Sequence, residues 1–169
     1  MARLACRESP HSEAPMSWDV IAFNFDGASP LKIDDLDETT LRPMGSTQNV
    51  RERISTCLDG VDWSDPTWGI FEGDGFSFEF NVGEDKVETK DFMIHVRGRG
   101  DAVCSLLKFA VPNKWSLLDC STSEFIDPTN PSNEGWEKFQ AFRDRAIGAV
   151  APKKIQVHPT PKNPWWKLW

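Results

Sequence analysis

The most regular hydrophobic pattern in the chain is a strict alternation of apolar and polar residues from position 76 to position 82. The apolar members would all face one side of a strand: Phe76, Phe78, Phe80 and Val82. Residues 91–97 show the same two-residue period. Strands that are apolar on one face and polar on the other are typical of antiparallel sheets with one face buried and the other in water. We therefore predict that these two segments belong to one such sheet.

Further segments complete the predicted secondary structure. Residues 19–25 are apolar on both faces, which favours a central strand. Shorter strands are predicted at 68–72, 115–120 and 123–126. Helices are predicted at 46–58, 102–111 and 127–148, with Asp101 capping the second, and Asn130 or Ser132 the third. The order is then β-α-β-β, β-α-β-β, α, which predicts an α+β fold with a single, mainly antiparallel sheet and helices packed on one face.

A faint internal repeat accompanies this order. Cys57 precedes Trp68 by 11 residues, and Cys104 precedes Trp115 by the same distance. Each pair would span a helix and the strand that follows it. This spacing raises the hypothesis of an internal duplication of a βαββ unit.

The length of 169 residues indicates one domain, which we place at residues 16–150. Residues 1–15 are rich in Pro, Ser and Glu and are expected to be a disordered extension, with Met16 as an alternative start. Residues 151–169 are expected to be a flexible tail rich in Pro, Lys and Trp. No apolar run approaches the roughly 20 residues of a membrane-spanning helix, and no secretory signal is found, so a cytoplasmic protein is expected.

The cysteines do not indicate a metal site or a disulfide framework. The chain has four of them without any CxxC pair: Cys6, Cys57, Cys104 and Cys120. A zinc site would favour paired ligands, and in a reduced compartment thiols inside the domain are expected to be free and buried. No other motif points to a bound group, so neither a metal nor a cofactor is expected.

Charge divides the chain into an acidic body and a basic tail. The whole chain carries a formal charge of −7, to which residues 151–169 contribute +4 through four lysines and no acid. Residues 1–15 are neutral, so residues 16–150 carry −11. An acidic body should repel nucleic acid, whose binding requires a basic surface. It should attract basic proteins.

The segment from 59 to 74 combines carboxylates with two tryptophans and is the predicted partner-binding surface. Its residues are Asp59, Asp62, Trp63, Asp65, Trp68, Glu72 and Asp74. Because binding energy concentrates at aromatic anchors inside a polar rim, we expect one continuous patch with Trp63 or Trp68 at its edge. Four acids of the first connection could extend it: Asp34, Asp35, Asp37 and Glu38. The alternative is that these acids are solvated turn residues.

A second hypothesis centres on His95, the only histidine within the predicted domain. Suppose that the two alternating strands pair so that Phe78 lies opposite Val96. Glu79 then faces His95, and Arg97 lies on the same water-exposed side. These three polar residues are the candidates for a catalytic or small-ligand site, and the alternative is an ordinary pair of surface side chains.

The tail contains three tryptophans within five residues, at Trp165, Trp166 and Trp169, beside lysines. This composition suits contact with a membrane interface, which would make the protein a peripheral adaptor. It also suits docking into a partner's pocket. A third option is that the tail folds back on its own domain.

Several segments resemble a group of small uncharacterised bacterial proteins that open with MSWD. They are MSWDVIAFNF at 16–25, VDWSDPTWGIFEGDGFSFEFNVG at 61–83, MIHVRGRGD at 93–101, LDCSTSEFID at 118–127 and NPSNEGWEKFQAFRD at 130–144. The likeness covers about residues 16–145. It implies a bacterial cytosolic domain without an assigned function, and it supplies no catalytic residues.

The leading hypothesis is a non-enzymatic interaction protein that binds a basic protein through its acidic face. In size and charge such a protein resembles toxin-immunity proteins, an analogy that no motif carries. An enzyme or ligand-binding protein that uses His95 is the first alternative, and a peripheral adaptor that uses the tail is the second.

Overall fold

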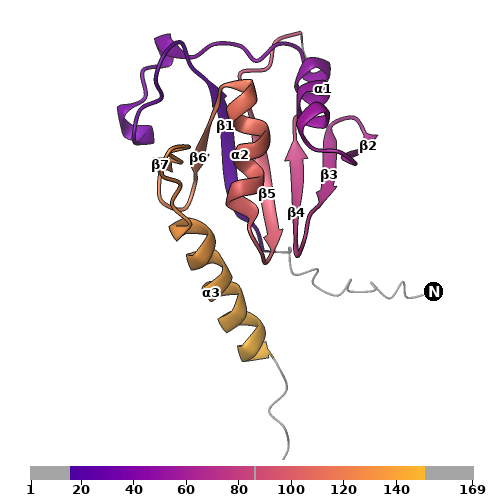
Figure 1. Ribbon diagram of the computed structural model, residues 1–169, viewed down its shortest axis with the longest axis vertical. Coiled ribbons are helices and arrows are strands. Elements are labelled where there is room, and N and C mark those ends of the chain that lie inside the picture. The colour runs from indigo at the N-terminus through magenta and orange to yellow at the C-terminus, as the bar shows by residue number, and fades with distance from the viewer. Residues whose placement is uncertain (1–15, 86, 151–169) are drawn as a thin grey trace, which may run out of the picture.

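The computed structural model describes residues 16–85 and 87–150, which form one antiparallel sheet and three α-helices (Figure 1). The strands are β1 (Trp18–Asn24), β2 (Asp62–Asp65), β3 (Trp68–Glu72), β4 (Phe76–Asn81), β5 (Asp91–Gly98), β6 (Trp115–Asp119) and β7 (Glu124–Phe125). The helices are α1 (Thr47–Cys57), α2 (Ala102–Asn113) and α3 (Glu134–Val150). Across the sheet the strands follow the order β2-β3-β4-β5-β1-β6-β7. The predicted α+β class with a single antiparallel sheet is confirmed.

The two alternating segments form neighbouring strands, β4 and β5. Their apolar residues are all buried: Phe76, Phe78, Phe80, Phe92, Ile94 and Val96. The strands pair with Phe78 opposite Val96 and with Glu79 opposite His95, as the sequence predicted. The two-residue period therefore places every apolar side chain of both strands on one face of the sheet.

Helices α1 and α2 pack against this apolar face and complete the main core (Figure 1). Ile54 of α1 and Phe109 of α2 are fully buried in it, and the ring centroids of Phe109 and Phe80 lie 5.5 Å apart. Asp101 caps α2 as predicted, because its carboxylate accepts a hydrogen bond from the backbone N–H of Cys104 (3.2 Å). Helix α3 projects beyond the end of the sheet, and its first turns contact the core through Trp136, which is 2% exposed.

Two boundaries differ from the sequence-based expectation. The edge strand β2 was not predicted, because only Trp63 of its four residues is even half-buried and no alternation marks it. The segment 127–148 was expected to be a helix capped by Asn130 or Ser132; helix α3 begins at Glu134, whose backbone N–H donates to Ser132 Oγ (3.2 Å). Asp127 accepts hydrogen bonds from the backbone N–H and the hydroxyl of Thr129, which holds residues 127–129 in a turn.

The spacing that suggested a duplication joins residues in different structural positions. Cys57 is the last residue of α1, whereas Cys104 is the third residue of α2. Strand β2 also intervenes between α1 and Trp68, while Trp115 opens the first strand after α2. The two Cys–Trp spacings therefore do not mark equivalent points of two repeated units.

The side of the sheet that faces away from α1 and α2 is divided into two halves. Over β1, β6 and β7, the segment 26–41 covers a second small core built around Phe23, Phe25 and Leu118. Over β3, β4 and β5, no described segment covers the corresponding face; we call this region the open sheet face. Within the described residues, no helix has both the length and the apolar character needed to cross a bilayer.

Candidate functional site

The open sheet face lies on β3, β4 and β5 and borders β1, where Ile21 packs against the second small core. Antiparallel pairing aligns one row of side chains across β3, β4, β5 and β1: Ile70, Glu79, His95 and Asp19. A second row runs beside it: Trp68, Asn81, Met93 and Ile21. Because paired residues of neighbouring strands point to the same side of a sheet, these residues share one face. The face therefore combines aromatic, aliphatic and charged groups.

Trp68 and His95 form the centre of this face. The indole of Trp68 stacks on the imidazole of His95, with ring centroids 5.3 Å apart and an interplanar angle of 20°. The Nδ1 atom of His95 lies 2.8 Å from the Oδ1 atom of Asp19, which also accepts a hydrogen bond of 2.8 Å from Ser17 Oγ. The side chain of His95 is consequently only 21% exposed.

Glu79 and Arg97 form an ion pair beside this stack. Arg97 Nε donates to Glu79 Oε1 (2.5 Å) and Arg97 Nη2 donates to Glu79 Oε2 (3.2 Å). Glu79 lies opposite His95 as predicted, but its carboxylate bonds to Arg97 on the diagonal, and His95 bonds to Asp19 instead. The three residues predicted as catalytic candidates thus lie on one face, and each is held by a neighbouring side chain.

The edge strand adds carboxylates to the same face. Asp62 pairs with Ile70, and Asp65 pairs with Trp68, so both acids point to the side of the open sheet face. Glu72 pairs with Ser77 and points to the same side. Among the described residues, these three carboxylates form no ion pair. Trp68 and the 40% exposed side chain of Ile70 lie between them and Glu79.

Local hydrogen bonds keep these edge acids ionised. The pKa of Asp62 is lowered chiefly by the hydroxyl of Ser64 and further by its backbone N–H. The pKa of Asp65 is lowered in the same way by Thr67. Each hydrogen bond stabilises the carboxylate form. Both acids are exposed residues of the edge strand β2 that make local hydrogen bonds and also belong to a charged face.

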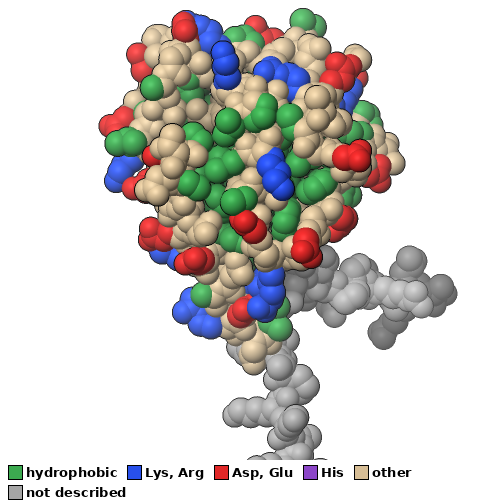
Figure 2. Space-filling view, viewed as in Figure 1, with side chains coloured by type: hydrophobic (Ala, Val, Ile, Leu, Met, Phe, Trp, Pro, Cys, Tyr) green, Lys and Arg blue, Asp and Glu red, His purple; other side chains and the backbone are tan. Residues whose placement is uncertain are grey.

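The two tryptophans of the predicted patch lie on opposite sides of the sheet. Trp63 points toward the helices, where its Nε1 donates to Ser55 Oγ (3.0 Å) and its ring packs 6.1 Å from that of Phe80. Figure 2 shows this helix-bearing side, on which apolar side chains gather near the centre and carboxylates lie mostly toward the rim. Trp68 alone contributes to the open sheet face.

The remaining predicted acids lie around this surface. Asp59 and Asp74 are exposed in the turns before β2 and between β3 and β4. The four acids of the first connection lie in the segment 26–41, on the same side of the sheet but over its other half: Asp34, Asp35, Asp37 and Glu38. Asp37 caps a short 3₁₀ turn, and its pKa is lowered chiefly by the hydroxyl of Thr39.

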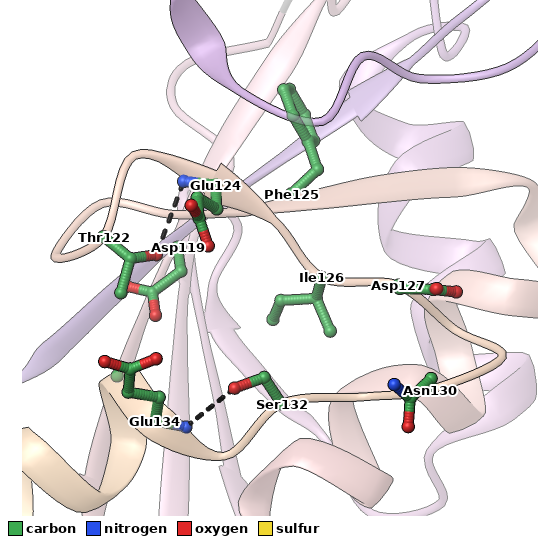
Figure 3. Close-up of a pocket in the computed structure, with 10 residues that line it drawn as sticks. Asp119, Thr122, Glu124, Phe125, Ile126, Asp127, Asn130, Ser132 and Glu134 are labelled. Atoms are coloured by element: carbon green, nitrogen blue, oxygen red, sulfur yellow. Dashed lines mark hydrogen bonds between the residues drawn. The ribbon is translucent and has the colours of Figure 1, made fainter.

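A separate acidic pocket of about 220 Å³ lies between β7 and the start of α3 (Figure 3). Four carboxylates line it: Asp119, Glu124, Asp127 and Glu134. These carboxylates already have ion-pair or hydrogen-bond partners within the chain. Glu134 bonds to Lys138 (2.6 Å), which lowers the pKa of that carboxyl, and Glu124 pairs with Lys32 (3.3 Å). Within the described residues no cluster of three metal-ligating side chains is found.

Asp119 anchors the wall of this pocket. Its Oδ1 accepts hydrogen bonds from Trp18 Nε1 (2.8 Å) and from the N–H and the hydroxyl of Ser121 (2.8 and 2.6 Å). The residue is 5% exposed. Asp119 thus joins the end of β6, the start of β1 and the first turn of α3, and its role is to hold the fold.

Sequence reasoning missed Asp19, Ser17 and Ile70 as members of the candidate site. The strands of Asp19 and Ile70 carry no polar–apolar alternation, so only strand pairing identifies these two residues as members of the face. Trp165, Trp166 and Trp169 lie outside the described residues.

No family model, curated protein or solved structure matches this chain, so the resemblance to MSWD proteins remains a sequence-based expectation.

Proposed function

We propose that this protein is an interaction module that binds a basic partner protein through the open sheet face. The observation that carries the proposal is the position of Trp68 and Ile70 among carboxylates that have no ion-pair partner within the described chain. A large aromatic side chain with a polar rim is the arrangement at which binding energy concentrates in protein interfaces. The surrounding charge favours a partner of opposite sign.

The shape and charge of the face favour a protein over other ligands. Residues 16–150 carry −11, which opposes binding to nucleic acid. Three pockets formed by the described residues are lined by residues other than His95, whereas small-ligand sites are usually concave. Trp68 covers one side of the His95 ring and Asp19 holds its Nδ1, so His95 is already bonded to its neighbours in this chain.

The charge of the edge acids can be tested without changing their shape. The test variant removes three charges from the face: Asp62→Asn, Asp65→Asn and Glu72→Gln. A matched control removes three charges elsewhere: Glu88→Gln, Asp127→Asn and Glu137→Gln. Asp127 suits the control because its carboxylate accepts the same two bonds from Thr129 that Asp65 accepts from Thr67.

Affinity capture from the native lysate, followed by mass spectrometry, identifies the bound proteins at two salt concentrations. Four proteins are compared: the wild type, the test variant, the control variant and Trp68→Ala. We expect the test variant and Trp68→Ala each to lose the same basic proteins, with the control variant retaining them. Salt should weaken capture by the wild type, because ions screen charges beyond about 8–10 Å. Equal capture by all four proteins would contradict the proposal.

A further inference from the structure

A groove of about 400 Å³ lies at the end of the sheet where β1 begins and α3 departs. Its apolar lining comes from Trp18, Phe139 and Phe142, with Asp19 and Cys120 also in its wall. Phe142 is 56% exposed, although it is a large apolar side chain on a helix. The groove is therefore an apolar surface that the described residues leave open.

The walls of the groove are firmly held. The ring of Trp136 stacks on that of Phe139 (centroids 5.4 Å apart, 16°) and lies 5.7 Å from that of Trp18. Trp136 Nε1 also donates to the carbonyl of Gly100 (2.9 Å). Farther along α3, Asp144 forms an ion pair with Arg99 (2.7 Å). A preformed apolar groove needs little rearrangement to accept a segment of chain.

The chain itself carries a segment with matching properties. Residues 151–169 follow α3 directly and contain Trp165, Trp166, Leu168 and Trp169 in their last five positions. They carry +4, opposite in sign to the −11 of residues 16–150. Four prolines, at 152, 159, 161 and 164, restrict the backbone, which lowers the entropy lost on docking.

The geometry of α3 allows this segment to return to the groove. Phe142 lies eight residues before Val150, which corresponds to about 12 Å of helix. The 15 residues between Val150 and Trp165 can span roughly 50 Å when extended. A short tether also keeps the segment at an effective concentration in the millimolar range near its own domain.

We propose that residues 165–169 dock into the groove between β1 and α3 of the same chain, with their aromatic side chains against Phe139 and Phe142. The lysines of residues 151–169 are attracted by the acidic domain as a whole, because Asp19 and Lys138 at the groove carry opposite charges. The groove shares Asp19 with the row of side chains beside the open sheet face, but its occupant belongs to this chain, so the test needs no partner protein.

Disulfide trapping in the full-length chain tests the proposal. Leu168→Cys is introduced into a chain in which Cys6, Cys57 and Cys104 are replaced by serine, so that only Cys120 can pair with it. Under mild oxidation we expect an intramolecular disulfide, seen by mass spectrometry of a monomeric product. A disulfide that links two chains and increases with protein concentration would overturn the proposal in favour of a second copy. Because the raised pKa of Cys120 slows its reaction, the oxidation is run at pH 9 and the small disulfide cystamine serves as a reference. If cystamine forms a mixed disulfide with Cys120 and the Leu168→Cys thiol does not, the proposal is overturned entirely.

Two matched variants control for chance collisions. Phe142→Asp changes the groove, and Val111→Asp changes an apolar residue of α2 with nearly the same exposure (52%) that does not line it. We expect Phe142→Asp to reduce the trapping rate at least tenfold and Val111→Asp to leave it unchanged. Trp166→Ser, a change in the proposed docking segment itself, should reduce it as well. Equal rates in all variants would show that the tail meets Cys120 without docking.

Discussion

The indole of Trp68 stacks on the imidazole of His95 across the intervening strand β4, with ring centroids 5.3 Å apart. One face of the histidine is thereby covered, while its Nδ1 is held by Asp19. A histidine fixed in this way stiffens the surface around Trp68, and a rigid aromatic side chain loses little entropy when a partner binds. The arrangement is consistent with His95 supporting the proposed binding face.

Replacing each tryptophan of the 59–74 segment separates binding from folding. Trp68→Ala should lower the free energy of unfolding by about 0.5–1.5 kcal/mol, the range for losing an aromatic pair. Trp63→Ala should cost more, about 2–3 kcal/mol, because Trp63 packs on Phe80 and bonds to Ser55. Urea denaturation measures both values.

The same two variants should show the opposite order in partner capture. Trp68 lies on the open sheet face and Trp63 on the helix side, so Trp68→Ala should lose capture and Trp63→Ala should keep it under conditions where both are folded. Loss of capture by Trp63→Ala alone would place the binding surface on the helix side instead.

Strand β4 offers a second pair of variants. Phe78→Ala should lower the free energy of unfolding by roughly 3–5 kcal/mol, since Phe78 is fully buried and its removal leaves a cavity. Glu79→Ala, one residue away on the other face, loses the ion pair with Arg97 and should cost about 1 kcal/mol or less. Chemical denaturation with both variants checks the difference, and equal costs would contradict the assignment of the two faces.

Local patterning accounts for most of the fold. The alternation in β4 and β5 predicted the buried face, because a shift of one residue would expose every phenylalanine. The register with Phe78 opposite Val96 was assumed, and the strand pairing has it. Strand β2 escaped prediction because an edge strand with one half-buried side chain carries no period. For α3 the sequence offered two caps, and the helix begins after the later one, Ser132, because Asp127 and Thr129 form a turn before it.

The candidate site depends more strongly on long-range topology. Its polar residues Glu79, His95 and Arg97 were identified because they interrupt an apolar pattern. The partner of His95, Asp19, is 76 residues away in the chain and becomes adjacent only because β1 pairs with β5. The opposite orientations of Trp63 and Trp68 also follow from the pairing of β2 with β3, which the sequence did not indicate.

The thiol of Cys120 should react slowly with alkylating reagents. The expectation that the thiols of the domain are buried is wrong: Cys104 and Cys120 are exposed and Cys57 is half-buried. The pKa of Cys120 is nevertheless raised to about 11, first because neighbouring atoms partly desolvate the thiolate, and then because Asp19 and Asp119 are close. Relative to an ordinary thiol with a pKa of 9.0, the thiolate fraction at pH 8 falls by roughly two orders of magnitude. Below its folded pKa the group is neutral, so the rate should keep rising with pH up to about 11.

Alkylation by iodoacetamide between pH 7 and 11, followed by peptide mass spectrometry, measures this dependence. The same peptide in the urea-unfolded chain supplies the reference rate. Asp19→Asn should increase the rate at pH 8, because it removes one of the nearby negative charges. A folded-state profile that coincides with the unfolded one would contradict the assigned pKa.

The first turn of α3 depends on a glycine for steric reasons. A Cβ atom at Gly135 would lie 1.7 Å from Oδ2 of Asp119 and 2.9 Å from Oγ of Ser121. Asp119 cannot withdraw easily, since its other oxygen accepts three hydrogen bonds, one of them from the buried indole of Trp18. Gly135→Ala should therefore lower the free energy of unfolding by about 3 kcal/mol or more, through overpacking and the loss of these bonds.

Gly148→Ala is the matched control in the same helix, because a Cβ there would meet no atom within 4 Å. This second change should be neutral or stabilising by up to about 1 kcal/mol, as expected when alanine replaces glycine in an exposed helix. Thermal and urea unfolding of both variants provide the comparison, and a stable Gly135→Ala protein would show that α3 does not pack against Asp119 as described.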